Sequence, residues 1–211
     1  MGKTLEVKSM DEFNLIITGV GGQGLITLGR IIGETAVRKD VNALISEIHG
    51  MAQRGGQVVV HIRIGSVNSP LVPLGGANAI LGLELIELAR NLKYANMKTV
   101  IVANNRVIRP SIPRVKLPSK DSIVSALKSK GLRVIVLNAL ELAIKAGAPI
   151  VENMVMLGAL IASTEISRFF SLSEVEEVLK SIVPERYIEV NIKALKLGYD
   201  EASKLKSTFI V

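Results

Sequence analysis

The chain has 211 residues, no cysteine, two histidines and a formal net charge of +7, from 26 Lys and Arg against 19 Asp and Glu. This length fits one well-buried α/β domain. The absence of cysteine excludes a thiolate nucleophile, a disulfide and a cysteine-ligated zinc or iron–sulfur site within the chain, and two histidines are too few for a histidine-rich metal centre.

The positive charge favours an anionic ligand or an acidic partner. Nucleic acid is not expected, because only 3% of the residues are aromatic and the basic residues are scattered instead of forming an arm. The apolar stretch at residues 154–162 is far shorter than the roughly 18 residues of a membrane span. The first residues lack the apolar core of a secretory signal, so we expect a cytoplasmic protein without a membrane span.

Strands and helices are predicted to alternate over the first 150 residues or so. Strands are expected at 13–18, 41–48, 57–64, 77–83, 99–103 and 133–137. Helices are expected at 23–38, 84–92, about 119–131 and 139–146, and the proline-containing segment 106–118 is expected to be irregular. This alternation is typical of the α/β class, and we predict a Rossmann-like, doubly wound, mostly parallel sheet.

From about residue 151 onward only helices are predicted, at 151–163, 173–182 and 185–206. Ser173 and Glu176 have capping-box spacing at the start of the second of these helices. No repeat or low-complexity segment separates this part from the rest. We therefore predict one domain over residues 1–211 with a helical C-terminal part.

The segment TGVGGQG, residues 18–24, follows the first predicted strand and fits the pattern G-x-G-x-x-G through Gly19, Gly21 and Gly24. In dinucleotide-binding proteins this pattern brings backbone N–H groups at a helix N-terminus close to a pyrophosphate. Glu47 lies 23 residues beyond Gly24, near the place where an acidic residue holds the ribose. The pattern leaves two alternatives open, an NAD or FAD site and a turn that only packs a helix against a strand.

A second glycine-rich segment, HGMAQRGG at residues 49–56, follows the second predicted strand. Gly55 and Gly56 allow positive φ angles or a close approach by another chain, and Gln53 and Arg54 carry donors for a carboxylate, phosphate or carbonyl. An ordinary connection does not need these residues, which favours a contact surface. The alternative is a hairpin-like turn with Arg54 in solvent.

Four segments together resemble the gamma-type subunits of 2-oxoacid:ferredoxin oxidoreductases, most strongly those of the indolepyruvate type: ITGVGGQGLITLGRIIGETA, SEIHGMAQRGGQVVVHIRIG, SPLVPLGGANAILGLELIELAR and NMVMLGALIA. The likeness is dense over residues 13–109 and thinner beyond, and GMAQRGG is its most specific motif. The resemblance implies a Rossmann-like domain that does not use NAD and that packs against thiamine-binding subunits near their active site. It therefore outweighs the dinucleotide interpretation.

The resemblance also implies that the chain works in a complex that oxidatively decarboxylates a 2-oxoacid, transfers the acyl group to coenzyme A and passes electrons to ferredoxin. Thiamine diphosphate, Mg²⁺ and the iron–sulfur clusters would belong to an alpha subunit, and this chain would bind no cofactor alone. The isolated chain is expected to be inactive, and a homodimer formed through surfaces meant for its partner stays open. A free-standing NAD(P)-binding oxidoreductase and a nucleotide-binding regulatory module stay open as alternatives.

Eleven residues form the predicted ligand-binding or partner-binding set: Gly19, Gly21, Gly22, Gln23, Gly24, Glu47, His49, Gln53, Arg54, Gly55 and Gly56. The loop at 19–24 is expected to offer N–H groups to an anion or a partner carbonyl, and Gln23 a side-chain amide. Arg54 is expected to face an anion, because a guanidinium binds a carboxylate or phosphate in bidentate fashion. Glu47 is expected to orient Arg54 or a backbone amide, and His49 to be a structural residue or, less favoured, an acid or base.

Overall fold

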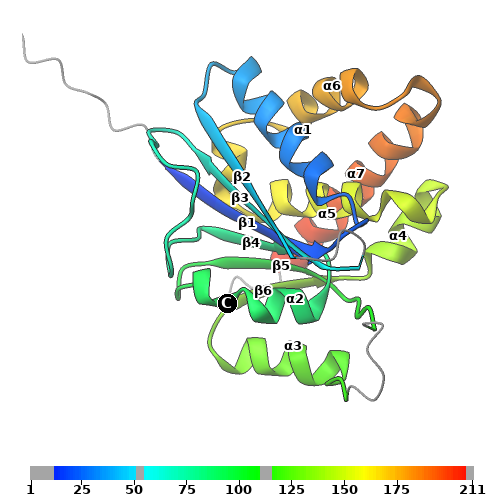
Figure 1. The fold of residues 1–211 in the computed structure, drawn as a ribbon. Coiled ribbons are helices and arrows are strands. Elements are labelled where there is room, and N and C mark those ends of the chain that lie inside the picture. Colours follow the sequence, from blue (N-terminus) through cyan, green and yellow to red (C-terminus); the bar gives the residue numbers. More distant parts are fainter. Residues whose placement is uncertain (1–11, 51–54, 110–115, 208–211) are drawn as a thin grey trace, which may run out of the picture.

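The structure is a computed structural model that describes residues 12–50, 55–109 and 116–207. Its centre is a six-stranded sheet in the order β2-β3-β1-β4-β5-β6, with helices on both faces (Figure 1). The predicted α/β class and mostly parallel sheet are confirmed. The strands are β1 Phe13–Val20, β2 Ala43–His49, β3 Gln57–Ile64, β4 Ala79–Gly82, β5 Val100–Asn104 and β6 Arg133–Leu137.

The helices follow the predicted order closely. The α-helices are α1 Leu25–Arg38, α2 Leu85–Arg90, α3 Lys120–Ser129, α4 Ala139–Ala146, α5 Glu152–Ser163, α6 Leu172–Ile182 and α7 Glu185–Ser207. Short 3-10 turns lie at Leu92–Tyr94, Pro149–Val151 and Glu165–Arg168. None of the helices in the described part of the chain combines the length and apolar character that crossing a membrane requires.

Strand β3 departs from the simple parallel arrangement. It pairs antiparallel with β1 on one side and with β2 on the other, whereas β1, β4, β5 and β6 are parallel to one another. The register joins the end of β1 to the start of β3, with Gly19 opposite Val58 and Val20 opposite Gln57. The end of β2 and the start of β3 therefore lie at the same edge of the sheet as the glycine-rich loop after β1. We call this the carboxyl edge.

The two faces of the sheet bury separate apolar clusters because neighbouring side chains of a strand point to opposite faces. Leu15 and Ile17 of β1 pack with α1 and α5, and Ile16 packs with α2 and α3. Figure 1 shows α1, α5, α6 and α7 on one face and α2 and α3 on the other. The helix after β1 and the helix after β4 therefore leave on opposite faces, which makes the gap between β1 and β4 the topological switch point of the sheet.

The helical C-terminal part packs on the α1 face through an unusually close crossing of α5 and α7. A Cβ atom on Gly158 would meet the backbone of Leu195 and Tyr199, and a Cβ atom on Gly198 would meet the backbone of Val155. Two glycines, one on each helix, thus allow the two backbones to touch.

The predicted capping box of α6 was placed two residues too late. The N-cap is Ser171, whose hydroxyl accepts from the N–H of Glu174, while the Glu174 carboxylate accepts from the N–H of Ser171. Ser173 lies inside the first turn, and Glu176 forms an ion pair with Lys196 of α7 at 3.3 Å. Both spacings fit the motif, and the extended backbone of Ser171, with φ −86° and ψ 167°, decides between them.

Candidate functional site

The two glycine-rich segments meet at the carboxyl edge. The N–H of Gly21 donates to the carbonyl of Gly56 at 2.8 Å, so the loop after β1 is bonded to the residue just before β3. Gly22, Gly24 and Gly55 have φ angles of +99°, +79° and +74°, which side chains rarely adopt. The sequence pattern predicted flexible backbone at both places, and the fold brings the two places together.

Gln23 holds the glycine-rich loop after β1, here called the first loop, in position. Its Oε1 accepts from the N–H of Val20 at 2.7 Å, and its Nε2 donates to the carbonyl of Leu83 at 3.0 Å. The predicted role for this amide was to bind a ligand. In the structure it ties the end of β1 to the end of β4, across the switch point. A Cβ atom on Gly19 would lie 2.7 Å from the Gln23 Oε1, so this arrangement also depends on glycine at position 19.

A small cavity of about 310 Å³ lies between the first loop and the end of β2. Its lining comprises Gly21, Gly22, Gly24, Leu25, Ile26, Thr27, His49 and Val58. The helix α1 begins here, and Gly24 supplies no side-chain cap. The N–H groups of its first turn therefore point toward this cavity without the usual capping acceptor.

Glu47 and His49 form a pair on β2, with 3.1 Å between the Glu47 Oε2 and the His49 Nε2. Both side chains are exposed to a large extent. Because β3 lies between β1 and β2, Glu47 stands on the outer strand, one strand further from the glycine loop than in a dinucleotide site. Its place does not fit the residue that holds a ribose. Gln53 and Arg54 lie outside the described residues.

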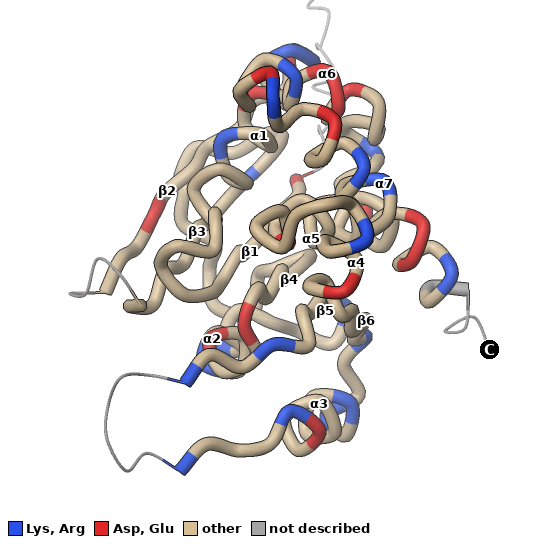
Figure 2. The backbone as a smooth tube through the Cα atoms, turned by 90° about the vertical axis from the view of Figure 1, so that its right-hand side faces the viewer, with Lys and Arg blue, Asp and Glu red and all other residues tan. Residues whose placement is uncertain are grey.

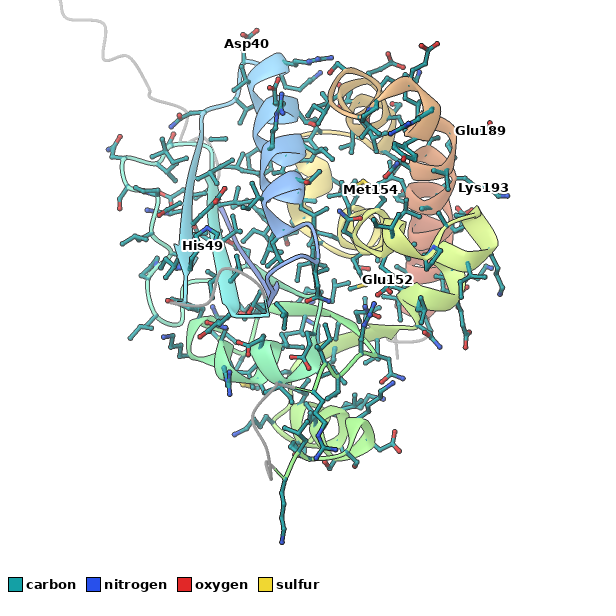
Figure 3. All side chains as sticks on the ribbon, turned by 45° about the vertical axis from the view of Figure 1, so that its right-hand side comes forward. Asp40, His49, Glu152, Met154, Glu189 and Lys193 are labelled. Atoms are coloured by element: carbon teal, nitrogen blue, oxygen red, sulfur yellow. The ribbon has the colours of Figure 1, made fainter. Side chains whose placement is uncertain are left out.

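A larger cavity of about 380 Å³ lies at the switch point, on the other side of the first loop. Its lining comprises Gly22, Gln23, Leu83, Asn104, Arg106, Leu140, Pro149, Ile150, Glu152 and Asn153. Gly22 lines both cavities, so the first loop forms the ridge between them. In Figure 3, His49 and Glu152 lie on either side of the start of α1.

One wall of the larger cavity is a polar network that the sequence interpretation missed. The Asn104 Nδ2 donates to the Glu152 Oε2 at 3.0 Å, and the Arg106 guanidinium is paired with the other oxygen of Glu152. The Asn104 Oδ1 accepts from the N–H of Ala139 at 3.2 Å. A polar residue at the end of a buried parallel strand indicates such a site, and Asn104 is the last residue of β5.

The same cavity also has an apolar part that is open to solvent. Ile150 is 85% exposed and Leu140 is 37% exposed. Isolated exposed apolar side chains are ordinary, but two of them beside a cavity with a charged pair are typical of a binding surface. The arrangement can hold a group that combines an apolar part with hydrogen-bonding atoms.

The residues present do not fit a resident metal cluster. In the described part of the chain, no group of three or more His, Cys, Asp or Glu is placed to hold a metal ion. Thiolates are the usual ligands of iron–sulfur clusters, and the sequence contains none.

Comparison with known proteins identifies the family of this chain. The family model for pyruvate ferredoxin/flavodoxin oxidoreductase matches residues 14–201. The chain is 41% identical over 194 residues to the indolepyruvate oxidoreductase subunit IorB of Archaeoglobus fulgidus, covering 90% of this chain and 96% of that one. It is 40% identical over 199 residues to the protein of the same name from Methanothermobacter thermautotrophicus, covering 92% and 99%.

A solved structure shows the same fold at lower identity. The gamma subunit of a keto/oxoacid ferredoxin oxidoreductase from Geobacter sulfurreducens superposes with a TM-score of 0.67 at 23% identity, covering 90% of this chain and 98% of that one. The predicted resemblance is therefore confirmed, and the dinucleotide alternative is not supported. This chain belongs to the pyruvate ferredoxin/flavodoxin oxidoreductase family.

Proposed function

We propose that the chain is a subunit of an indolepyruvate-type 2-oxoacid:ferredoxin oxidoreductase, inactive alone, that shapes the active site of a thiamine-bearing partner. The relatives that support this are indolepyruvate oxidoreductase subunits of similar length. The complex would oxidatively decarboxylate an arylpyruvate to an acyl-CoA and pass electrons to ferredoxin. The proposed preference for an aryl substrate rests only on the names of these relatives.

The observation that carries the proposal is the antiparallel β3 between β1 and β2. It moves Glu47 away from a ribose position and brings the second glycine segment against the first, through the bond between Gly21 and Gly56. The carboxyl edge therefore presents backbone donors, the His49 and Glu47 pair and exposed apolar side chains on one surface. Such a surface suits a protein partner better than a nicotinamide coenzyme.

We propose a role for each predicted residue. The N–H groups of Leu25–Thr27 would bind an anionic group or a carbonyl of the partner, because the N-terminus of α1 carries partial positive charge. The N–H groups of Gly21 and Gln23 already donate to the carbonyls of Gly56 and Val20. Arg54, with Gln53 beside it, would bind a carboxylate or phosphate. Glu47 would keep His49 oriented, at the 3.1 Å separation seen here.

The proposal assigns the cofactors to the partner. Thiamine diphosphate with Mg²⁺ supplies the carbanion chemistry when it is bound there, and iron–sulfur clusters carry the electrons. This chain's residues would enclose the substrate or coenzyme A and exclude water. We propose that the complex is cytoplasmic and that the isolated chain forms a homodimer through its uncovered apolar side chains.

Co-expression with the products of neighbouring genes tests the proposal. A brown, iron-containing complex that includes this chain and oxidises indolepyruvate with coenzyme A and ferredoxin is the expected result. A colourless chain that co-purifies with no partner in any combination would contradict it. Titration of the purified chain with NADH is expected to give no fluorescence enhancement, and tight stoichiometric binding would favour the dinucleotide alternative.

The variant Arg54→Ala tests the anion-binding role. In the assembled enzyme it is expected to raise the apparent KM for coenzyme A or the oxoacid, or to weaken assembly, by roughly tenfold or more, since a charge-assisted bidentate contact contributes about 1.5–3 kcal/mol. Arg30→Ala on the exposed face of α1 is the matched control. If both the kinetics and the assembly of Arg54→Ala are unchanged, Arg54 does not bind an anion at this site.

A further inference from the structure

The positive charge of this chain is concentrated in one continuous part of it. Residues 91–140 contain ten of the 26 Lys and Arg but only one of the 19 Asp and Glu, Asp121. The remaining 161 residues contain sixteen basic and eighteen acidic residues, so they are slightly negative. The whole excess of positive charge therefore belongs to residues 91–140, although the basic residues there do not form an uninterrupted run.

The fold gathers this charge on the face of the sheet that α2 and α3 cover. Most of the described basic residues of this part lie in the 3-10 turn after α2, in the loop that enters α3, along α3 and at the start of β6. Lys98 precedes β5, and Arg106 and Arg109 follow it, with Arg106 at the carboxyl edge. Figure 2 shows basic segments at both ends of α3 and in the loop leading to it, away from the mixed charges of α6 and α7. We call this surface the α2–α3 face.

The charges on the α2–α3 face are largely uncompensated. Within the described part of the chain, Arg106 is paired with Glu152 and is the only basic residue of 91–140 with an ion pair. The exposed basic residues without one are Lys93, Lys98, Arg109, Lys116, Lys120, Lys128, Lys130 and Arg133. Like charges gathered on one face repel one another, and an acidic surface brought against them relieves that repulsion.

An apolar cleft of about 250 Å³ lies within this face, between α2 and α3. Its apolar lining consists of Ala89, Leu92, Pro118, Ile123, Ala126 and Leu127, and Lys130 stands at its rim. Only Ile123 and Leu127 are buried. The cleft is wide enough for one aliphatic or aromatic side chain, and Lys120 and Lys128 lie on the same helix as the rim residue Lys130.

We propose that the α2–α3 face docks an acidic segment of another protein, which inserts an apolar side chain into the cleft and sets carboxylates against the lysines. The identity of the partner, another subunit of the same complex, rests on the proposed function. The docking surface is separate from the carboxyl edge. The subunit would thus contact its complex on two sides.

Two observations favour a protein over other anionic occupants. Tyr94 is the only aromatic residue of 91–140, and its ring stacks edge-on against His61 at 5.1 Å, so no free aromatic ring is offered to nucleic acid bases. The apolar element is a hollow, whereas a membrane-binding surface needs a protruding apolar side chain that enters the lipid. Acidic segments with an apolar anchor fit both the charge and the cleft.

Zero-length cross-linking of the purified complex tests the proposal directly. A carbodiimide joins an amine to a carboxylate only where the two touch. Cross-links from Lys93, Lys120 or Lys130 to Asp or Glu of another subunit are the expected result. A complex that forms but shows no cross-link from this face to another subunit would overturn the docking site and leave the proposed function standing. A chain that finds no partner would overturn both.

Two variants give a quantitative test of the same docking site. Lys120→Glu/Lys130→Glu is expected to weaken binding of this chain to the rest of the complex at least about tenfold at low salt, with a smaller effect at high salt. Lys145→Glu/Lys193→Glu, with the same change of net charge on α4 and α7, is the matched control. Equal weakening in the two double variants would contradict a local contact.

The cleft is tested by filling it. Ala126→Trp is expected to weaken the same binding at least about tenfold, whereas Ser125→Trp, its neighbour outside the cleft lining, leaves it unchanged. Thermal melting of both variants checks that each is folded. An oligonucleotide and vesicles containing phosphatidylserine are the competing probes. If the free chain binds either probe tightly and Lys120→Glu/Lys130→Glu abolishes that binding, the occupant of this face is that probe's class of molecule and not an acidic protein segment.

Discussion

His61 shows how one residue can be polar, buried and structural. It lies in β3 at 1% exposure, and its Nδ1 accepts from the N–H of Val72 at 3.1 Å, which places the proton on Nε2. The Nε2 has no hydrogen-bond partner among the described residues. Burial and the nearby charge of Lys93 both lower the pKa of His61, so the ring is held neutral.

Acid is therefore expected to destabilise the chain through His61. Well above pH 6.5 the ring is neutral in both the folded and unfolded states, and near and below pH 6.5 the unfolded chain binds a proton that the folded chain resists. The free energy of unfolding should fall as the pH is lowered from 8 to about 5.5. In His61→Phe this pH dependence should flatten, at a cost of roughly 1–2 kcal/mol at pH 8 from the orphaned Val72 N–H. Urea titrations across this range measure both effects.

Some site residues could be predicted from the sequence and others could not. The glycines at 19–24 and 55–56 stood out because their residue type itself indicates unusual backbone angles, which the structure shows at Gly22, Gly24 and Gly55. Arg106 and Glu152 gave no such signal. They are 46 positions apart, ordinary in type, and joined only by the fold.

At the scale of elements, the crossing of α5 and α7 depends on glycine. Gly158→Ala would force a methyl group into the carbonyl oxygen of Leu195, and backbone cannot move aside as a side chain can. We expect a loss of roughly 3 kcal/mol in the free energy of unfolding, measured by urea denaturation. Ser203→Ala, on an exposed turn of α7, should leave stability almost unchanged. A Gly158→Ala protein of full stability would show that the two helices pack less closely than described.

The start of α6 depends on an acidic residue that joins two helices. Glu174 accepts from the N–H and the hydroxyl of Ser171, and its other oxygen lies 2.6 Å from the Lys39 Nζ at the end of α1. The hydrogen bond from Lys39, followed by those from Ser171, lowers the pKa of Glu174 to about 2. Its stabilising effect is complete above pH 4.5 and is lost as the pH falls toward 2.

Glu174→Gln is accordingly expected to destabilise the chain at neutral pH and to match the unsubstituted chain near pH 2. Urea midpoints at pH 7, 4 and 2 follow this difference. Glu141→Gln, an exposed acidic residue of α4, is the control whose midpoint should stay close to the reference at every pH. If Glu174→Gln lowers the urea midpoint equally at all three pH values, the loss of stability comes from packing and not from the charge of Glu174.

Element types were predictable because they depend on local patterns. The alternation of apolar runs and turn residues located all six strands, with most ends within two residues. The end points were harder, because caps decide them. The helix after β1 begins at Leu25 and not at residue 23, since Gln23 bonds back to Val20 and Gly24 is left-handed.

For the molecule as a whole, the carboxyl edge is predicted to be the side that meets the thiamine-bearing partner. Ile150→Asp should change the free energy of unfolding by less than about 0.5 kcal/mol, because the side chain is 85% exposed. It should weaken assembly about tenfold or more, since a charge would be buried in an apolar contact. Analytical ultracentrifugation of the co-expressed proteins measures the assembly.

Val37→Asp is the matched control for this prediction. Val37 is similarly exposed but lies at the far end of α1, away from the carboxyl edge. Equal weakening by both variants would mean that the contact is not restricted to the carboxyl edge. A stable assembly with Ile150→Asp would show that the partner contacts another face of this chain.

The sequence by itself determined the class of fold, the order of its elements and the family, because hydrophobic periodicity, turn residues and motifs are local properties. Only the tertiary structure decided that β3 runs antiparallel between β1 and β2, that Gly21 bonds to Gly56, and that Asn104, Arg106 and Glu152 line one cavity. The sequence pattern of a buried strand is the same whether its neighbour is parallel or antiparallel. Strand pairing and the surfaces it creates come from contacts between distant residues, which no local pattern records.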